Sequence, residues 1–165
     1  MNISRLFSAV LSCLALALPA AAQDGVGTPL QGDLLTGWQQ SDGRRVAAIR
    51  LRMAPGWKTY WRSPGEGGFP QTLNWEKSTN VSSLDILWPT PKEFEILGIK
   101  SIGYEEEVVF PLKIKLKEIT KSSTFIFDLN FLTCKDICLP GQASLQLILP
   151  AGVGQTTNHS YDIEK

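Results

Sequence analysis

The chain has 165 residues, which is enough for one domain with a sizeable apolar core. Its 16 basic and 16 acidic side chains leave a formal net charge of zero. A chain so balanced lacks the positive excess with which proteins bind nucleic acid or anionic membranes, so neither is expected as the main partner.

Residues 1–22 have the pattern of an export signal. Arg5 supplies a positive charge, an apolar stretch covers 6–18, and three alanines at 20–22 form a cleavage site. The apolar stretch is shorter than the roughly 20 residues of a membrane-spanning helix. We therefore expect cleavage of this signal peptide and a soluble, periplasmic mature protein without stable membrane insertion. The alternative is a lipoprotein anchored through Cys13.

Segments in which apolar and polar residues alternate follow the signal, and this is the pattern of half-buried strands. The clearest of them cover 47–53, 112–117, 125–131 and 145–149, and no long stretch has the helical period. Residues typical of turns separate these and further segments. They are Pro55-Gly56, Ser63-Pro64-Gly65, Gly98, Gly103 and Pro140-Gly141.

This succession of strands and turns predicts an all-β fold, an immunoglobulin-like antiparallel β-sandwich. We expect the domain to cover residues 23–150. The remaining segment, 151–165, is polar and is expected to be a loose C-terminal tail.

Two cysteines remain after signal cleavage, Cys134 and Cys138. On one straight strand they would lie about 13 Å apart, whereas a disulfide needs Cα atoms within about 7 Å. In an oxidising compartment such a pair is usually a disulfide. The segment between them must therefore curl into a turn, which joins a strand ending near Leu132 to a strand starting near Ala143. The pair is expected at the tip of a hairpin, where a partner can reach it.

Reversible redox chemistry is the leading interpretation of this pair, because a disulfide that closes so short a loop gains little stability from chain entropy. The thiolate is the attacking species; Lys135 would favour it and Asp136 would oppose it.

One alternative is a non-catalytic binding module in which the disulfide is a structural staple. Another is a copper-handling protein, in which the two thiolates and Met53 hold Cu(I). The sequence offers no zinc-like set of four ligands, since its single histidine, His159, lies in the tail; no metal and no cofactor are predicted.

Several short motifs, in order across about two-thirds of the chain, point to one family. They are the segment 55–62 with Pro64-Gly65, Gly68-Phe69-Pro70, Asn74-Trp75, Ser78, Asn80, Trp88-Pro89, Pro91, Gly103-Tyr104, Val108, Pro111 and the segment 134–140.

With these motifs the chain resembles the N-terminal periplasmic domain of the thiol:disulfide interchange protein DsbD, and the short exported proteins built around that domain. The resemblance implies an immunoglobulin-like fold and a redox-active cysteine pair, Cys134 and Cys138. It also implies a carrier of the protein-disulfide reductase type that works through mixed disulfides. The electron donor would be a membrane-embedded thiol-disulfide reductase, and the acceptors would be oxidised periplasmic thioredoxin-like proteins. Disulfide isomerisation, cytochrome c maturation and copper tolerance all remain open as the pathway served.

The family's best-known members have more widely spaced cysteines, capped by a loop that carries a Phe. Here the resemblance implies Phe94 as the cap, with Glu93 beside it. Tyr60, Trp61 and Tyr104 are further candidates for a cap or for the rim of a docking surface; for Tyr60 and Trp61, core packing is an equal alternative. No membrane region and no thioredoxin-like domain follow residue 150, so the electrons would come from a separate protein, or the chain is a fragment of a longer one.

Overall fold

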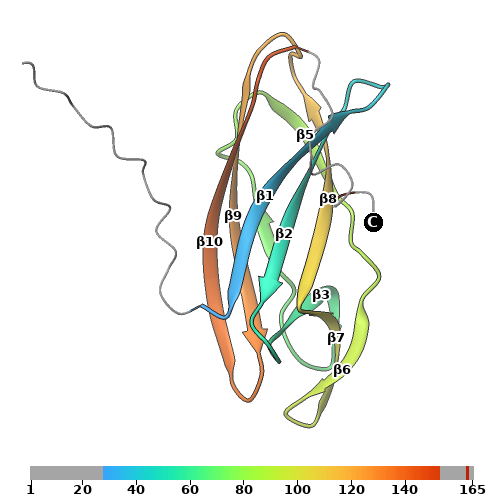
Figure 1. Cartoon of the computed structure of the whole chain (residues 1–165), viewed down its shortest axis with the longest axis vertical. Coiled ribbons are helices and arrows are strands. Elements are labelled where there is room, and N and C mark those ends of the chain that lie inside the picture. Colours follow the sequence, from blue (N-terminus) through green and yellow to red (C-terminus); the bar gives the residue numbers. More distant parts are fainter. Residues whose placement is uncertain (1–27, 153–162, 164–165) are drawn as a thin grey trace, which may run out of the picture.

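The computed structural model describes residues 28–152 and Ile163. The expected signal peptide lies outside these residues, as does most of the expected tail. Ten strands form two antiparallel sheets that face each other, so the domain is an immunoglobulin-like β-sandwich (Figure 1). Among the described residues, no helix is long and apolar enough to cross a membrane. The strands are β1 Leu30–Gln39, β2 Arg45–Met53, β3 Lys58–Gly65, β4 Thr72–Asn74, β5 Val81–Ile86, β6 Lys92–Ile96, β7 Ile99–Glu105, β8 Glu107–Leu116, β9 Ser123–Cys134 and β10 Cys138–Leu149.

One sheet has four strands in the order β1-β2-β8-β5. The other has six, in the order β10-β9-β3-β7-β6, with the short β4 pairing with β9. The pairing of β9 with β10 runs over twelve residues of each strand without a register shift. These two long strands stand at one side of the sandwich, and the β6–β7 hairpin lies near the end at which they turn (Figure 1).

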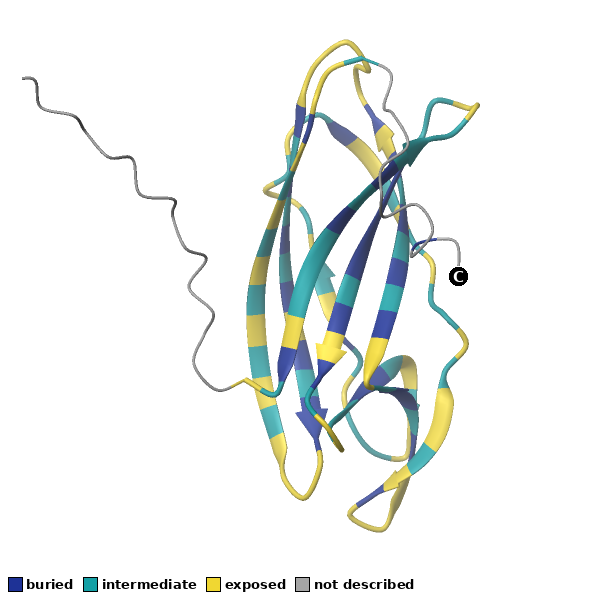
Figure 2. Cartoon of the chain, in the orientation of Figure 1, coloured by how far each residue is buried: buried dark blue, intermediate teal, exposed yellow. Residues whose placement is uncertain are grey.

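The strands predicted from alternation are confirmed as parts of β2, β8, β9 and β10. Their inward residues form the main core, and Figure 2 shows the alternation of buried and exposed positions along these strands. Burying large apolar side chains contributes about 1.5–3 kcal/mol each, so this core dominates the stability of the domain. Its fully buried members include Ile49, Leu51, Leu112, Ile114, Phe125, Phe127 and Leu129.

Three predicted turns are wrong. Ser63-Pro64-Gly65 ends β3, Gly103 lies within β7, and Pro140-Gly141 lies within β10. Proline is tolerated in β10 because this strand is at the sheet edge. Gly103 is required by close packing, since a Cβ there would lie 2.0 Å from the carbonyl oxygen of Thr59.

A second apolar cluster lies on the outer face of the four-stranded sheet. Leu35, Val46 and Ala48 are buried there against Ile163. Alternation along 47–53 places Ala48 on a face with arginines, so burial of this outer position was not expected from the pattern.

Candidate functional site: the Cys134–Cys138 hairpin

The last residue of β9 and the first residue of β10 are joined by a disulfide. Cys134 and Cys138 are directly paired across the two strands, with their Cα atoms 4.1 Å apart. The three residues between them form the turn, in which the Lys135 N–H donates to the carbonyl of Ile137 at 3.0 Å. The expected hairpin tip is confirmed, but it is tighter than predicted, because both strands continue to the cysteines themselves.

The two cysteines differ sharply in burial. Cys134 is fully buried, whereas Cys138 and the three turn residues are exposed. Side chains on β9 alternate, and the inward residues that pack in the main core are Phe125, Phe127, Leu129 and Phe131. Cys134 has the opposite parity and lies on the outer face of the six-stranded sheet. Something other than the main core must therefore cover it.

The cover is a small apolar cluster that is separate from the main core. Tyr60 from β3 and Ile96 from β6 are buried with Cys134, and Phe94 and Leu132 pack against them. The rings of Tyr60 and Phe94 are 6.3 Å apart and tilted. The β6–β7 hairpin thus folds over the outer face of the sheet and shields Cys134 from solvent.

Tyr60 also makes a polar contact with the disulfide. Its buried hydroxyl donates to Cys134 Sγ at 3.0 Å. Burial raises the pKa of Tyr60, because the charged phenolate is disfavoured away from water. The hydroxyl therefore remains a proton donor at neutral pH.

The Tyr60 ring is held from the other side by a glycine. Gly68 has a φ of +94°, and a Cβ at this position would lie 2.1 Å from the Tyr60 ring. Only glycine combines this backbone conformation with so close an approach. The Gly68-Phe69-Pro70 motif therefore fixes the ring that contacts the buried sulfur.

A charged pair borders the cluster. Lys58 is paired with Cys134 across β3 and β9 and with Glu105 across β3 and β7. Its Nζ lies 2.8 Å from the Glu105 carboxylate and 5.6 Å from the centre of the Phe94 ring. Lys58, which is ion-paired with Glu105, thus borders Cys134 on the side opposite Cys138.

The structure brings Tyr60 and Phe94 to the cysteine pair, but it places three other predicted residues elsewhere. Glu93 alternates with Phe94 on β6 and is exposed. Trp61 alternates with Tyr60 and packs against the main core, where Arg62 lies over its ring. Tyr104 is buried in the main core and donates to the carbonyl of Pro89 at 2.9 Å. Their roles in capping or docking remain predictions.

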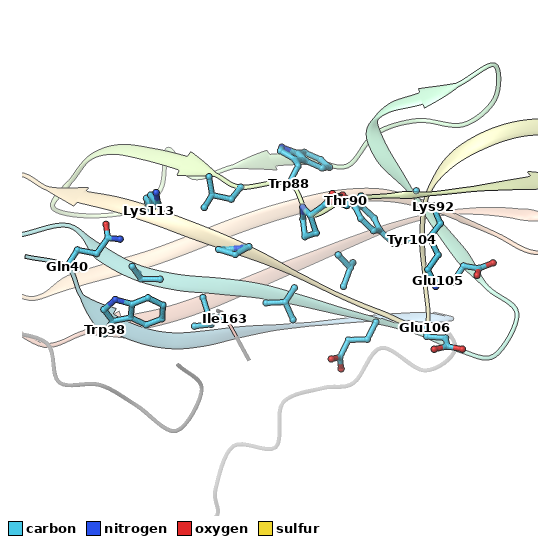
Figure 3. A pocket seen from close by; sticks show the side chains of 18 residues that line it. Trp38, Gln40, Trp88, Thr90, Lys92, Tyr104, Glu105, Glu106, Lys113 and Ile163 are labelled. Atoms are coloured by element: carbon cyan, nitrogen blue, oxygen red, sulfur yellow. Dashed lines mark hydrogen bonds between the residues drawn. The ribbon is translucent and has the colours of Figure 1, made fainter. Parts of the chain in front are cut away.

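Tyr104 instead lines a groove of about 670 Å³ (Figure 3). The groove follows the outer side of β8. Trp38 and Ile163 lie at one end, and Glu105 and Glu106 lie at the other (Figure 3). Neither cysteine lines it. Burial raises the pKa of the Tyr104 hydroxyl, so this group is neutral and serves as a structural donor.

The metal alternative receives no support from the contacts of Met53. This residue packs in the main core, whereas Cys134 belongs to the separate cluster beneath β6. Among the described residues, no group of three or more His, Cys, Asp or Glu side chains is placed to hold a metal ion.

Sequence reasoning missed two residues, Gln71 and Thr59, whose hydrogen bonds hold the strands beside Cys134 together. Gln71 is buried and donates to Thr59 Oγ1 at 2.8 Å, and Thr59 in turn donates to the carbonyl of Leu132 at 3.0 Å. These bonds fix β3 against β9 beside Cys134. The alternation of apolar and polar residues does not reveal a buried hydrogen bond between Thr59 and Gln71. The only clue in the sequence is that Thr59 is next to the candidate residue Tyr60.

The fold and this site together define a class of protein, an immunoglobulin-like domain with an asymmetrically buried cysteine pair at the tip of one hairpin. Residues 31–150 match the family described as thiol:disulfide interchange protein DsbD, N-terminal. The chain belongs to this family.

Two solved structures are similar. The N-terminal periplasmic domain of ScsB from Proteus mirabilis is 32% identical, with a TM-score of 0.66; the match covers 90% of this chain and 55% of that one. This chain therefore spans little more than half of that relative. The reduced N-terminal domain of Neisseria meningitidis DsbD is 9% identical, with a TM-score of 0.42, and the match covers 76% of this chain and 88% of that one. A comparison with curated proteins gives no match.

Proposed function

We propose that the protein is a periplasmic thiol–disulfide exchange carrier. Its cysteine pair accepts reducing equivalents from a membrane-embedded thiol-disulfide reductase and passes them to oxidised thioredoxin-like proteins. The observation that carries this proposal is the asymmetry of the pair. Cys138 is open to a partner, whereas Cys134 is buried and hydrogen-bonded to Tyr60.

The donor step begins at the exposed sulfur. A thiolate of the donor attacks Cys138 Sγ, the disulfide breaks, and Cys134 leaves as a thiolate. The Tyr60 hydroxyl is already within hydrogen-bonding distance of that sulfur. A hydrogen bond to the charged form lowers a pKa, and a thiol of lower pKa is the better leaving group. A second donor thiolate then releases Cys138.

The acceptor step reverses this order. The Cys138 thiolate attacks one sulfur of the acceptor disulfide, and the other acceptor sulfur leaves as a thiolate that takes a proton from water. The Cys134 thiolate then attacks Cys138 Sγ and displaces the acceptor. Two electrons pass to the acceptor, and the Cys134–Cys138 disulfide is restored.

A purely structural role for the disulfide is disfavoured by its surroundings. β9 and β10 are already paired over twelve residues each, and the disulfide closes a loop of only a few residues. The stabilisation from restricting so short a loop is below the about 3 kcal/mol of a 15-residue loop. A disulfide at this position therefore adds little stability to a hairpin that the pairing of β9 with β10 already holds together.

The test compares two variants that keep one cysteine each, in a chain in which Cys13→Ser removes the third thiol. With Cys134→Ser, the exposed Cys138 should form a mixed disulfide with oxidised glutathione. With Cys138→Ser, the buried Cys134 should react at least about tenfold more slowly. The unaltered pair should have a reduction potential above about −300 mV. A potential far below this value, together with a large loss of melting temperature in both variants, would make the disulfide structural.

A further inference from the structure

The strand that begins at Cys138 is the edge of its sheet. β10 pairs with β9 alone among the described strands, and its outer side runs along the flank of the sandwich (Figure 1). Leu145 shows where β1 lies relative to it: a Cβ on Gly32 would be 3.4 Å from the Leu145 side chain. β1 thus packs against the inward face of β10 and belongs to the other sheet, so it does not hydrogen-bond to the outer edge.

The register shows which backbone groups point outward. Directly opposed residues with Cα atoms about 4.5 Å apart are non-hydrogen-bonded pairs, whereas hydrogen-bonded pairs are about 5.5 Å apart. Cys134 and Cys138, at 4.1 Å, are therefore a non-hydrogen-bonded pair. Because the register continues without a shift, Pro140 and Leu132 form a pair of the same kind, which suits a residue without an N–H. The N–H and C=O of Cys138, of Gln142 and of every second residue beyond it therefore face the open edge.

Natural sheets usually protect their edges with charges, bulges or short strands. The other three terminal strands of this sandwich follow that rule. β6 has only five residues and carries Lys92, Glu93 and Glu95. β5 carries Asp85 and β1 carries Asp33, and both have shifts in register with their neighbours. β10 has twelve residues, no charged side chain and no shift. Its one protecting residue is Pro140, which lacks an outward N–H, so from Gln142 onward it is a long, regular and uncharged edge among the described strands.

We propose that this edge receives an extended segment of the redox partner, which adds to the sheet as a further antiparallel strand and places the partner's cysteine opposite Cys138. The inference rests on the proposed exchange function. Adding a strand to a free edge is a common mode of peptide recognition, in which main-chain hydrogen bonds supply affinity. Here the edge and the exposed sulfur begin at the same residue, so docking and chemistry share one position.

The geometry suits the exchange reaction. A partner residue hydrogen-bonded to Cys138 would have its Cα about 5.5 Å away, within the range that a disulfide spans. Directly opposed side chains share one face of the sheet. The partner's sulfur, Cys138 Sγ and Cys134 Sγ would then lie in one row across three strands, continuing the row of Lys58 and Glu105. Thiol–disulfide exchange requires the attacking sulfur and the leaving sulfur to lie on opposite sides of the attacked sulfur, and this row provides that arrangement.

The experiment uses the full chain with Cys13→Ser and Cys134→Ser, so that Cys138 is the sole thiol. The probe is a strand-forming peptide whose central cysteine is linked to thionitrobenzoate. Cys138 attacks the peptide sulfur, and the coloured thionitrobenzoate is released. A second peptide is identical except that alternate backbone nitrogens are methylated. We expect the unmethylated peptide to react at least about fivefold faster, the effect of one or two neutral hydrogen bonds.

Variants at Gln142 separate the backbone from the side chain. Gln142→Pro removes one outward N–H, which would donate to a peptide carbonyl, without removing a bond to β9. It should slow the reaction of the unmethylated peptide at least about twofold. Gln142→Ala keeps the N–H and should leave the rate of the unmethylated peptide unchanged. Oxidised glutathione should react equally with all three chains, which shows that the fold and the thiol are intact.

Equal rates for the two peptides with the parent chain would overturn the edge proposal and leave the exchange function standing. A rate of the unmethylated peptide that Gln142→Pro leaves unchanged would also overturn it. Failure of Cys138 to react with oxidised glutathione would instead reject the exchange function, and the edge proposal with it. A dimer in sedimentation that dissociates with Gln142→Pro would assign the edge to a second copy of the chain and contradict the proposal.

Discussion

Replacing Tyr60 with Phe tests the contact between the hydroxyl and the buried sulfur. The substitution keeps the ring that packs with Phe94 and removes only the donor that lies 3.0 Å from Cys134 Sγ. Hydrogen bonds to charged groups contribute about 1.5–3 kcal/mol, and a bond to the weakly accepting neutral thiol contributes about 0.5 kcal/mol. Since one pKa unit corresponds to about 1.4 kcal/mol, Tyr60→Phe should raise the pKa of Cys134 by about one to two units.

The measurement needs Cys134 as the only thiol, so both chains carry Cys13→Ser and Cys138→Ser. The pH dependence of the Cys134 Cβ chemical shift reports the thiolate without requiring a reagent to reach a buried atom. Tyr104→Phe is the matched control, because it removes another buried tyrosine hydroxyl, whose partner is the carbonyl of Pro89 at 2.9 Å. If Tyr60→Phe and Tyr104→Phe both titrate like the parent chain, the Tyr60 hydroxyl does not stabilise the thiolate, and its part in the donor step is rejected.

Two further predictions concern the cover over the buried sulfur. Phe94→Ala should speed reduction of the disulfide by dithiothreitol, because it removes a ring from the cluster around that sulfur; Leu97→Ala, at the exposed tip of the same hairpin, should not, and equal rates would remove Phe94 from the site. Gly68→Ala should destabilise the domain, measured by urea unfolding, by more than Gly98→Ala. Both glycines have positive φ, which costs alanine about 1–2 kcal/mol, but an added Cβ meets the Tyr60 ring only at Gly68 and meets nothing within 4 Å at Gly98. Equal losses of unfolding free energy in the two variants would show that the Tyr60 ring moves aside without an energetic cost.

The long strands and the position of the cysteines could be predicted because both depend on local sequence. Alternation at 47–53, 112–117, 125–131 and 145–149 reports which face is buried, and the reach of four residues demands a turn between Cys134 and Cys138. The failures are non-local. Whether Pro140 interrupts a strand depends on whether that strand is at the edge, and Gly103 is explained only by the Thr59 backbone that approaches it.

The burial of one cysteine was equally beyond the reach of the sequence. Cys134 is covered because β6 folds over the outer face of a sheet to which it is joined only through β7. No pattern around 134–138 carries that information. Phe94 and Tyr60 were named from a family resemblance and from aromatic content. They meet because β7 pairs with both β3 and β6 and so brings together Tyr60 and Phe94, which are 34 positions apart in the chain.

Cys134 belongs to a small satellite cluster and not to the main core, and this division has a thermodynamic consequence. Proteins open in cooperative units of different stability, and the apolar residues that hold the two sheets together are not members of the unit that covers the sulfur. Lifting that cover costs only the contacts of a few side chains. The proposed exchange cycle thus needs only this small unit to open, while the main core and the fold as a whole stay closed.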